Sequence, residues 1–392
     1  MKKGKVRTGL DRIDDAWPSE LRGARVGLLV HPASVNRELK HAIAVCRSSK
    51  SFTLSELFGP QHGILGQTQD NMIEWEGFRD PDTGLPVYSL YGRTRKPRKE
   101  TLERIDVLVV DLQDVGSRYY TFIWTLDLCM EACEESGKAV VVLDRPNPIT
   151  ASITEGPVLR TEFASFVGLK PLPIRHGMTM GEIGSYLRSA YHPKLQYYVV
   201  PMEGYARDLW FDECGLPWVM PSPNIPTLDS AIVYPGMCLL EGTELSEGRG
   251  TTRPFEIFGA PYVDAERLVR ALAELHLPGV AFRPLSFEPT FQKHAGVLCG
   301  GAQLHVLDRE QMKPYLTGVA VLKVIHDLYP ADFAWKDPPY EYEEKLPPID
   351  IIAGTDALRI AIDQGMSLDR MESQWKDERA AFEPIRRASL IY

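Results

Sequence analysis

Four short runs rich in valine and leucine constrain the fold more than any other feature of the chain. They are RVGLLVH (25–31), FTLSELF (52–58), DVLVVDL (106–112) and KAVVVLD (138–144). Their apolar residues alternate little with polar ones, which is typical of strands covered on both faces of a sheet. Between the last two runs, YTFIWTLDLCMEACEESG has apolar residues at helical spacing and ends at Gly137. This succession predicts a right-handed crossover in a parallel sheet.

The chain is long enough for two domains. Its 392 residues exceed what one hydrophobic core usually supports, since about 150 residues per domain is typical. The Pro-rich stretch GLPWVMPSPNIPTLDS (215–230) separates two patterns, so we predict one domain over residues 1–228 and a second over 229–392. Beyond it, VDAERLVRALAELHLPG predicts a surface helix capped by Asp264, VLCGGAQLHV predicts a strand, and KPYLTGVAVLKVIHDLYP and LDRMESQWKDERAAF predict further helices.

Charge and cysteine usage exclude several classes of protein. The 44 basic and 53 acidic residues are spread along the chain and give a net charge of −9, with no basic stripe for nucleic acid. The start, MKKGKVRTGLDRIDDAWPSE, lacks the apolar run of a signal peptide, and no window has about 18 uninterrupted apolar residues. We therefore expect a cytoplasmic chain without a membrane span, while export without a cleavable signal stays open. Six cysteines without metal or redox spacing predict buried free thiols. The oligomeric state has no signature in the sequence.

Polar residues follow three of the predicted strands, where ligands of open parallel sheets bind. The first cluster, FGPQHGILG (58–66), presents Gln61 and His62 on a loop stiffened by Pro60. A structural hydrogen-bonding role for His62 is the alternative to a catalytic one. The segment QDNMIEWEGF that follows adds Asp70, Asn71, Glu74 and Glu76. An apolar neighbour such as Trp75 would raise the pKa of one of these glutamates, as a general acid requires, and a solvated loop carboxylate is the alternative.

The second and third clusters carry acids, amides and arginines. The second, DLQDVGSRYYT (111–121), contributes Asp111, Gln113, Asp114 and Arg118, and the third, LDRPNP (143–148), contributes Asp144, Arg145 and Asn147. For the second cluster, the alternative is that its aspartates cap the following helix and its arginine pairs with one of them. In the third, two prolines stiffen the segment, which favours rigid presentation of polar side chains to a ligand.

A charged, glycine-rich stretch stands out in the second half of the chain. EGTELSEGRGTTRPF (241–255) combines bendable glycines with arginine forks suited to an oxyanion, and its candidate site residues are Glu241, Glu244, Glu247, Arg249 and Arg253. Its Gly-Arg-Gly turn also allows backbone N–H groups to face an anion. The alternative is a surface loop of self-paired charges. Upstream, PSPNIPT (221–227) presents Asn224 between prolines, with a stiff linker as the alternative.

Several familiar sites are absent from the sequence. No GxGxxG follows a predicted strand, and the chain contains no GxxxxGK[ST], no GxSxG, no HExxH and no HxH. These absences weigh against nicotinamide chemistry, P-loop nucleotide hydrolysis, elbow-type serine hydrolysis and zincin chemistry, so we expect no cofactor and no metal. What remains is a set of carboxylates, arginines, amides and aromatic rings that suits the binding and cleavage of a sugar.

Specific motifs extend this interpretation along nearly the whole chain. They are FGPQHGILG, SLYG, DLQDVGSRYYTF, VLDRPNP, EGPVL, SFVG, PIRHGMTMGE with His176, WVMPSPNIPT, YPGMCLLEGTELSEGRGTTRPFEIFGAP and AFEPIRRASLIY. In this order they resemble the NamZ-type exo-β-N-acetylmuramidases, glycoside hydrolase family 171. The resemblance implies an α/β fold with a Rossmann-like N-terminal domain that binds no dinucleotide, a smaller C-terminal α/β domain, and an active-site cleft between them.

The resemblance also implies a substrate. Family members release terminal N-acetylmuramic acid from peptidoglycan fragments, and the lactyl carboxylate of that sugar suits Arg249 or Arg253. Its amide and hydroxyl groups suit Asn147, Asn224 and Gln113. The remaining candidate binding residues are Gln61, Asp111, Arg118, Asp144, Arg145, His176 and Glu241.

One position departs from the family pattern. The usual loop reads Pro-Glu-His-Gly, and its glutamate is a natural catalytic acid, but this chain has Gln61. Glycoside hydrolysis ordinarily needs two carboxyl groups, or one together with the acetamide of the substrate. We predict Glu74 as the substitute acid and Asp114 or Glu244 as its partner, with His62 beside them. The alternatives are a sugar-binding protein without catalysis, and an enzyme for a different recycling intermediate.

Overall fold

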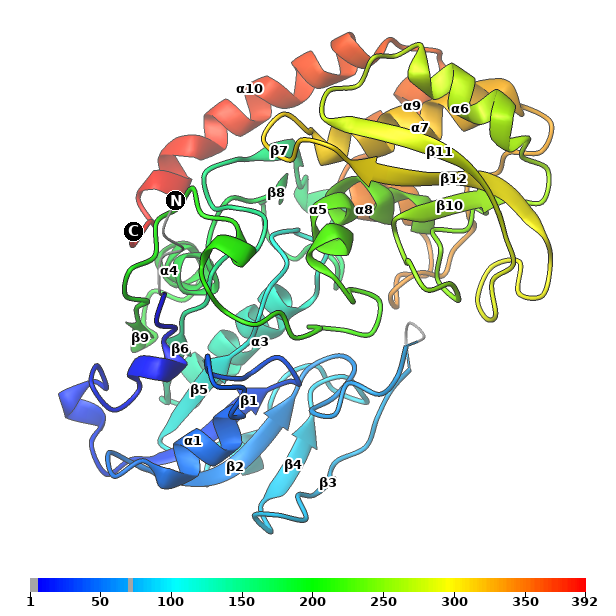
Figure 1. Ribbon diagram of the computed structural model, residues 1–392. Helices are drawn as coiled ribbons and strands as arrows, with labels where there is room; N and C mark the ends of the chain where they lie inside the picture. The colour runs from blue at the N-terminus through cyan, green and yellow to red at the C-terminus, as the bar shows by residue number, and fades with distance from the viewer. Residues whose placement is uncertain (1–5, 70–72) are drawn as a thin grey trace.

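The structure is a computed structural model that describes residues 6–69 and 73–392. Asp70 and Asn71, two of the candidate polar residues, lie outside these ranges. The N-terminal part is built on one seven-stranded sheet (Figure 1) in the order β3-β4-β2-β1-β5-β6-β9. Neighbouring strands pair in parallel, except for the antiparallel pair β3–β4. The strands are β1 (Arg25–Val30), β2 (Thr53–Gly59), β3 (Phe78–Arg79), β4 (Pro86–Ser89), β5 (Val107–Asp111), β6 (Ala139–Leu143) and β9 (Tyr197–Val200).

Both faces of this sheet are buried, which explains its unalternating apolar runs. Leu28 and Val109 belong to one hydrophobic cluster, and their neighbours Leu29 and Leu108 belong to another. Helix α1 (Ala42–Ser48) packs in the first cluster, whereas α3 (Phe122–Glu135) and α4 (Met180–Ala190) pack in the second. The predicted parallel sheet with its crossover helix is therefore confirmed. A short helix, α2 (Lys99–Leu102), precedes β5.

The C-terminal part has a smaller sheet of three antiparallel strands, in the order β10-β12-β11 (Figure 1). Asp264 caps α6 as predicted, because its side chain accepts a hydrogen bond from Arg267 N. The three strands of this sheet are β10 (Ile257–Ala260), β11 (Val280–Phe287) and β12 (Cys299–Val306). The helices are α5 (Leu228–Met237), α6 (Ala265–Ala273), α7 (Pro314–Leu328), α8 (Pro348–Ala353), α9 (Ala357–Asp363) and α10 (Leu368–Arg387).

The two parts are tied together by the end of the chain. Helix α10 packs on β7 (Glu155–Val158), which pairs with β8 (Pro173–Arg175), and then runs toward α4, where the C-terminus lies (Figure 1). The hydroxyl of Tyr392 donates a 2.8 Å hydrogen bond to Asp144, just beyond β6. The division at residues 228 and 229 stays a prediction. Short 3-10 helices lie at Leu10–Arg12, Ser19–Leu21, Thr161–Phe163, Phe211–Glu213 and Cys238–Gly242.

Two further sequence expectations concern cysteines and membrane spans. All six cysteines are buried free thiols, as predicted. Within the described residues, none of the helices has the length and apolar character needed to cross a bilayer.

Candidate active site

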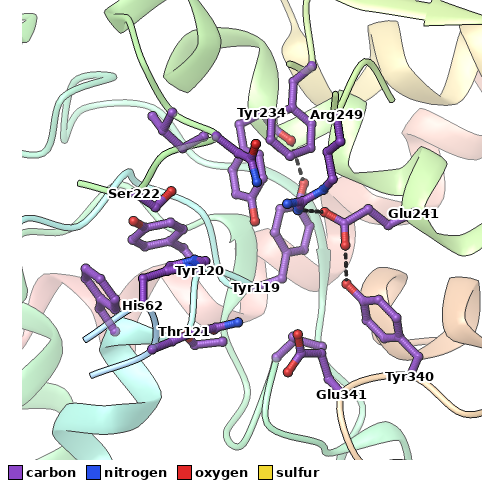
Figure 2. Close-up of a pocket in the computed structure, with 16 residues that line it drawn as sticks. His62, Tyr119, Tyr120, Thr121, Ser222, Tyr234, Glu241, Arg249, Tyr340 and Glu341 are labelled. Carbon is purple, nitrogen blue, oxygen red and sulfur yellow. Dashed lines mark hydrogen bonds and ion pairs between the residues drawn. The ribbon is translucent and has the colours of Figure 1, made fainter. Parts of the chain in front are cut away.

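A small pocket lies where the carboxyl end of the parallel sheet meets loops of the C-terminal part. Figure 2 shows His62 and Tyr120 on one side of it and Glu241 and Tyr340 on the other. The enclosed space measures about 40 Å³. Its lining combines aromatic rings with a few polar groups, the usual composition of a ligand site. The lining residues are Gln61, His62, Tyr119, Tyr120, Thr121, Phe122, Val167, Ser222, Asn224, Ile225, Tyr234, Glu241, Arg249, Phe255, Tyr340 and Glu341.

A chain of side-chain hydrogen bonds crosses one wall of the pocket. Thr121 Oγ1 donates to Gln61 Oε1 at 2.7 Å, and Gln61 Nε2 donates to the Tyr91 hydroxyl at 3.2 Å. Tyr91 in turn donates to Glu341 Oε2 at 3.0 Å. Gln61 and Glu341 therefore lie on either side of a single hydroxyl group, although one follows β2 and the other precedes α8.

Glu341 has an unusual environment for a carboxyl group. Its side chain is only 4% exposed. Burial raises the pKa of Glu341 to about 7, although the hydrogen bond from Tyr91 acts in the opposite direction. Its backbone φ is +44°, in the left-handed region that residues other than glycine rarely adopt. A buried carboxyl group that keeps a proton near neutral pH suits acid–base chemistry.

Glu241 lies in the same pocket, but its pKa is lowered where that of Glu341 is raised. Arg249 Nη2 donates to Glu241 Oε1 at 2.7 Å, and the Tyr340 hydroxyl donates to Glu241 Oε2 at 2.7 Å. Burial opposes ionisation, but the charge of Arg249 outweighs it, and the pKa of Glu241 lies below its ordinary value. The pocket thus holds one carboxylate and one readily protonated carboxyl group, as acid–base sites often do.

His62 contributes a neutral ring. Its Nδ1 lies 2.8 Å from the carbonyl oxygen of Thr68, so Nδ1 carries the proton and Nε2 is left as an acceptor. Burial lowers the pKa of His62 to about 4. At neutral pH the ring therefore serves as a hydrogen-bonding group and carries no charge. Residues 6–69 and 73–392 contain no cluster of three His, Cys, Asp or Glu side chains placed to hold a metal ion.

Comparison with known families decides the relationship of this chain. The N-terminal model of the exo-β-N-acetylmuramidase NamZ matches residues 26–229, and the C-terminal model matches residues 232–392. The chain belongs to the NamZ exo-β-N-acetylmuramidase family. The peptidoglycan β-N-acetylmuramidase NamZ of Bacillus subtilis is 44% identical over 391 residues, which cover 100% of this chain and 92% of that protein.

The fold of the NamZ family is also found in solved structures. A DUF1343 family protein from Bacteroides fragilis superimposes with a TM-score of 0.88 at 34% identity, and the match covers 99% of each chain. A second DUF1343 family protein from the same organism gives a TM-score of 0.77 at 28% identity, again over 99% of each chain. The predicted family and two-part α/β architecture are therefore confirmed.

Five of the predicted site residues line the pocket of this NamZ family member: Gln61, His62, Asn224, Glu241 and Arg249. Asn224 is held by Gln69, whose carbonyl oxygen accepts from Asn224 Nδ2 at 2.6 Å. Arg249 also lies 3.1 Å from Glu247 through Nε, so its guanidinium bridges two buried carboxylates. Arg249 therefore does pair with glutamates of its own stretch, 241–255, as the alternative predicted. The pairs are buried inside the protein and do not lie on a surface loop.

Four predicted residues at or just beyond the ends of β5, β6 and β8 form buried internal pairs. Arg145 binds both carboxylate oxygens of Asp111, at 2.5 and 2.7 Å. His176 lies 3.1 Å from Asp114, which also accepts from Gly116 N. None of these four lines the pocket. The alternative helix-capping role is wrong for both aspartates, because the N-cap of α3 is Thr121.

The other amides and acids of these loops fix the backbone. Gln113 Nε2 donates to the carbonyl of Pro146 at 2.9 Å, and Asn147 Nδ2 donates to that of Met178 at 3.0 Å. Asp144 accepts from the Gly181 amide at 2.8 Å, and burial raises its pKa to about 6. These side chains position the loops around the site and lie outside its lining.

Arg118 joins the two parts of the molecule. Its Nη2 donates to the carbonyl oxygen of Ile352 at 2.7 Å, and its Nη1 donates to that of Leu172 at 3.2 Å. It has no aspartate partner within the described residues, so the alternative role, an ion pair with Asp111 or Asp114, is wrong. Burial lowers the pKa of Arg118 to about 10.

The remaining three predicted residues are at the surface. Glu74 is exposed and accepts a long 3.5 Å contact from the Tyr342 hydroxyl. Glu244 is exposed, and Arg253 pairs with Glu256 at 3.1 Å. None of the three lines the pocket, and their proposed roles as acid, partner and lactyl ligand stay predictions.

Glu341 was missed by the sequence reasoning. It lies in DPPYEYEEKLPP (337–348), where three neighbouring glutamates resemble an ordinary solvated loop. Two pairs of prolines, 338–339 and 347–348, flank this segment. Like the prolines around Asn147 and Asn224, they were a signal of a rigid segment.

Proposed function

We propose that this chain is a glycoside hydrolase that removes terminal N-acetylmuramic acid from fragments of peptidoglycan. The observation that carries the proposal is the meeting of Glu241 and Glu341 in one buried pocket. Hydrolysis of a glycoside needs a proton donor at the leaving oxygen and a group that attacks or stabilises C1 from the other side, which is either a second carboxylate or the acetamide of the sugar. A family member with a protonatable carboxyl group and a fixed carboxylate in its pocket has the parts for this reaction.

Several residues of the pocket suit the groups of the proposed sugar. Arg249 remains the proposed partner of the lactyl carboxylate, which would join its existing pairs with Glu241 and Glu247. Nε2 of His62 offers an acceptor to a sugar hydroxyl, and Asn224 and Gln61 offer amide groups. Tyr119, Tyr120 and Tyr234 supply ring surfaces for the pyranose.

The pocket must widen to admit the sugar. Its volume of about 40 Å³ is far below the roughly 300–1,000 Å³ of typical small-molecule pockets. Tyr340 and Glu341 form part of its wall, and the Tyr91 hydroxyl holds Glu341 to the N-terminal part. We expect loops elsewhere in the wall to move outward when a sugar enters and to close over it afterward.

The proposal is tested with two aryl glycosides that differ only in the lactyl ether. Wild-type protein is incubated with 4-nitrophenyl β-N-acetylmuramide and with 4-nitrophenyl β-N-acetylglucosaminide, and nitrophenolate release is recorded. We expect at least about tenfold higher kcat/KM for the muramide, since a charge-assisted hydrogen bond contributes roughly 1.5–3 kcal/mol. Arg249→Lys should reduce that preference, with Arg253→Lys as the matched control. Absence of hydrolysis of every glycoside, with binding retained, would support the non-catalytic alternative instead.

We place the reaction in the cytoplasm, on saccharides derived from peptidoglycan. The six free, buried cysteines support this location because thiols persist in reducing compartments. Detection of the protein in fractionated cells tests it, and recovery from the culture medium would contradict it.

A further inference from the structure

With Gln61 in place of the usual glutamate, the glycosidic oxygen has no obvious proton donor. A carboxamide has no acidic proton, so Gln61 is unable to act as a glutamate would in the usual family loop. Departure of a sugar alcohol without protonation would be slow, because an alkoxide is a poor leaving group. Another acid must therefore reach the place that Gln61 occupies. This step rests on the function proposed above.

Glu341 reaches that place from the other half of the chain. The Tyr91 hydroxyl accepts from Gln61 Nε2 and donates to Glu341 Oε2, so only one hydroxyl separates the amide from the carboxyl group. The direction of donation is fixed, because Thr121 already donates to Gln61 Oε1. Glu341 Oε1 accepts no hydrogen bond from residues 6–69 or 73–392 and is the oxygen available to a substrate.

Glu341 also lies on the wall between two cavities. On one side is the enclosed pocket with Glu241 and Arg249. On the other is an open groove of about 600 Å³, whose lining includes Arg95, Phe166 and Tyr342. A terminal sugar in the pocket and the rest of the fragment in the groove would place the glycosidic oxygen between them, beside Glu341.

The turn that carries Glu341 is held in place. Tyr340 and Glu343 exchange two backbone hydrogen bonds of 2.9 Å across it, and both Glu341 and Tyr342 have positive φ. The Arg95 guanidinium lies 3.4 Å above the Tyr342 ring, a cation–π contact that fixes the turn from outside. Rare backbone conformations persist only where the surroundings maintain them, and they cluster at functional sites.

We propose that Glu341 is the general acid of this enzyme, acting from the C-terminal part where the usual family loop offers a glutamate at the position of Gln61. Its Oε1 gives a proton to the glycosidic oxygen as the C1–O bond breaks and that bonding pair moves to the oxygen. The acetamide oxygen of the sugar bonds to C1 at the same time. A water molecule then adds to C1 as the bond between C1 and the acetamide oxygen breaks, and that bonding pair returns to the oxygen, which restores the acetamide. The water gives one proton to the Glu341 carboxylate, which restores the acid. The net reaction consumes one water and needs no other reactant.

Burial favours this role, since a pKa of Glu341 near 7 leaves about half of the carboxyl groups protonated at neutral pH. Glu241 is the unsuitable member of the pair. Its pairing with Arg249 keeps it ionised.

The test uses leaving groups of different basicity. A 2,4-dinitrophenyl glycoside of N-acetylmuramic acid leaves without protonation, whereas the disaccharide of N-acetylmuramic acid and N-acetylglucosamine requires it. We expect Glu341→Gln to lower kcat/KM for the disaccharide by at least about a hundredfold, within the range for general acids. For the dinitrophenyl glycoside we expect less than about a tenfold loss. Glu344→Gln, an exposed neighbour, is the matched control and should resemble wild type.

The outcomes separate the assignment from the function. An equal loss on both substrates would mean that Glu341 has a structural role, and no loss on either would mean that another group is the acid; each result overturns the assignment alone. An inactive wild-type protein overturns the proposed function and the assignment with it.

Discussion

The Tyr91 hydroxyl donates a 3.0 Å hydrogen bond to Glu341 Oε2, across 250 residues of sequence. This bond joins the end of the parallel sheet to the turn before α8 and places a carboxyl group from the C-terminal part beside Gln61. Because the same hydroxyl accepts from Gln61, its proton is directed toward Glu341. Tyr91 is a positioning residue in this arrangement, and its role is measurable through the pH dependence of the reaction.

Tyr91→Phe removes the donor to the Glu341 carboxylate. A hydrogen bond to the charged form lowers the pKa of a carboxyl group, so its loss should raise the pKa of Glu341 further. We expect the alkaline limb of the kcat/KM profile to move to higher pH and the maximum to fall severalfold. Tyr88→Phe is the control, since Tyr88 lies on β4, just before Tyr91, and lines a different cavity. An unshifted profile in Tyr91→Phe would contradict the proposed coupling.

Gln61→Glu restores the acid of the usual family loop. Two carboxyl groups would then flank the Tyr91 hydroxyl, which has one proton to donate, so they would compete for protons. We expect kcat/KM near pH 6 to stay within about tenfold of the wild-type value. We also expect the alkaline limb of the kcat/KM profile to lie at higher pH than in the wild type, by analogy with general acids of raised pKa. Gln67→Glu on the exposed part of the loop is the control. A hundredfold gain at every pH would show that the wild-type protein lacks a working acid.

Folding stability should depend on the protonation of Glu341. Its folded pKa of about 7 exceeds the unfolded value, so the native state binds the extra proton between the two. Stability from this group is present at pH 4 and is lost as pH rises through 7. Glu341→Gln should therefore be more stable than wild type at pH 8, by on the order of 2 kcal/mol, and nearly equal to it at pH 4. Urea unfolding at both pH values measures the difference, and the opposite trend would contradict the raised pKa.

The two arginines of 241–255 should differ sharply in their effect on folding. Arg249→Met removes the guanidinium that pairs with buried Glu241 and Glu247. Glu247 keeps its 3.0 Å pair with Lys293, but breaking a buried ion pair typically destabilises a protein by about 3–5 kcal/mol. Arg253→Met breaks a partly exposed pair with Glu256, usually worth less than about 1 kcal/mol. Urea denaturation of both variants gives the comparison. Equal losses would mean that Arg249 is not an organising ion in the pocket.

Much of the fold follows from local sequence. The apolar runs at 25–31, 52–58, 106–112 and 138–144 predict β1, β2, β5 and β6, because strands buried on both faces need no polar alternation. Strand β12 and the helix capped by Asp264 were predicted as well. Strand β11 was missed, since VAFRPLSF contains a proline, as edge strands do.

The site was only partly predictable. Gln61 and His62 follow β2 and do reach the pocket, as ligand residues of parallel sheets should. Asp111 ends β5 and Asp114 follows it closely, but Arg145 and His176 hold them in the interior. Glu341 has no sequence relationship to β2 or β4. Its place beside Tyr91 arises from packing between the two halves of the chain, which motif spacing does not encode.

The most direct test is mass-spectrometric analysis of the products that wild-type protein and Glu341→Gln form from the disaccharide with N-acetylmuramic acid at its non-reducing end. We predict free N-acetylmuramic acid and N-acetylglucosamine from the wild-type protein, and almost none from the variant in the same time. Intact disaccharide after prolonged incubation with the wild-type protein would contradict the hydrolase function, and equal release by the variant would contradict the role of Glu341.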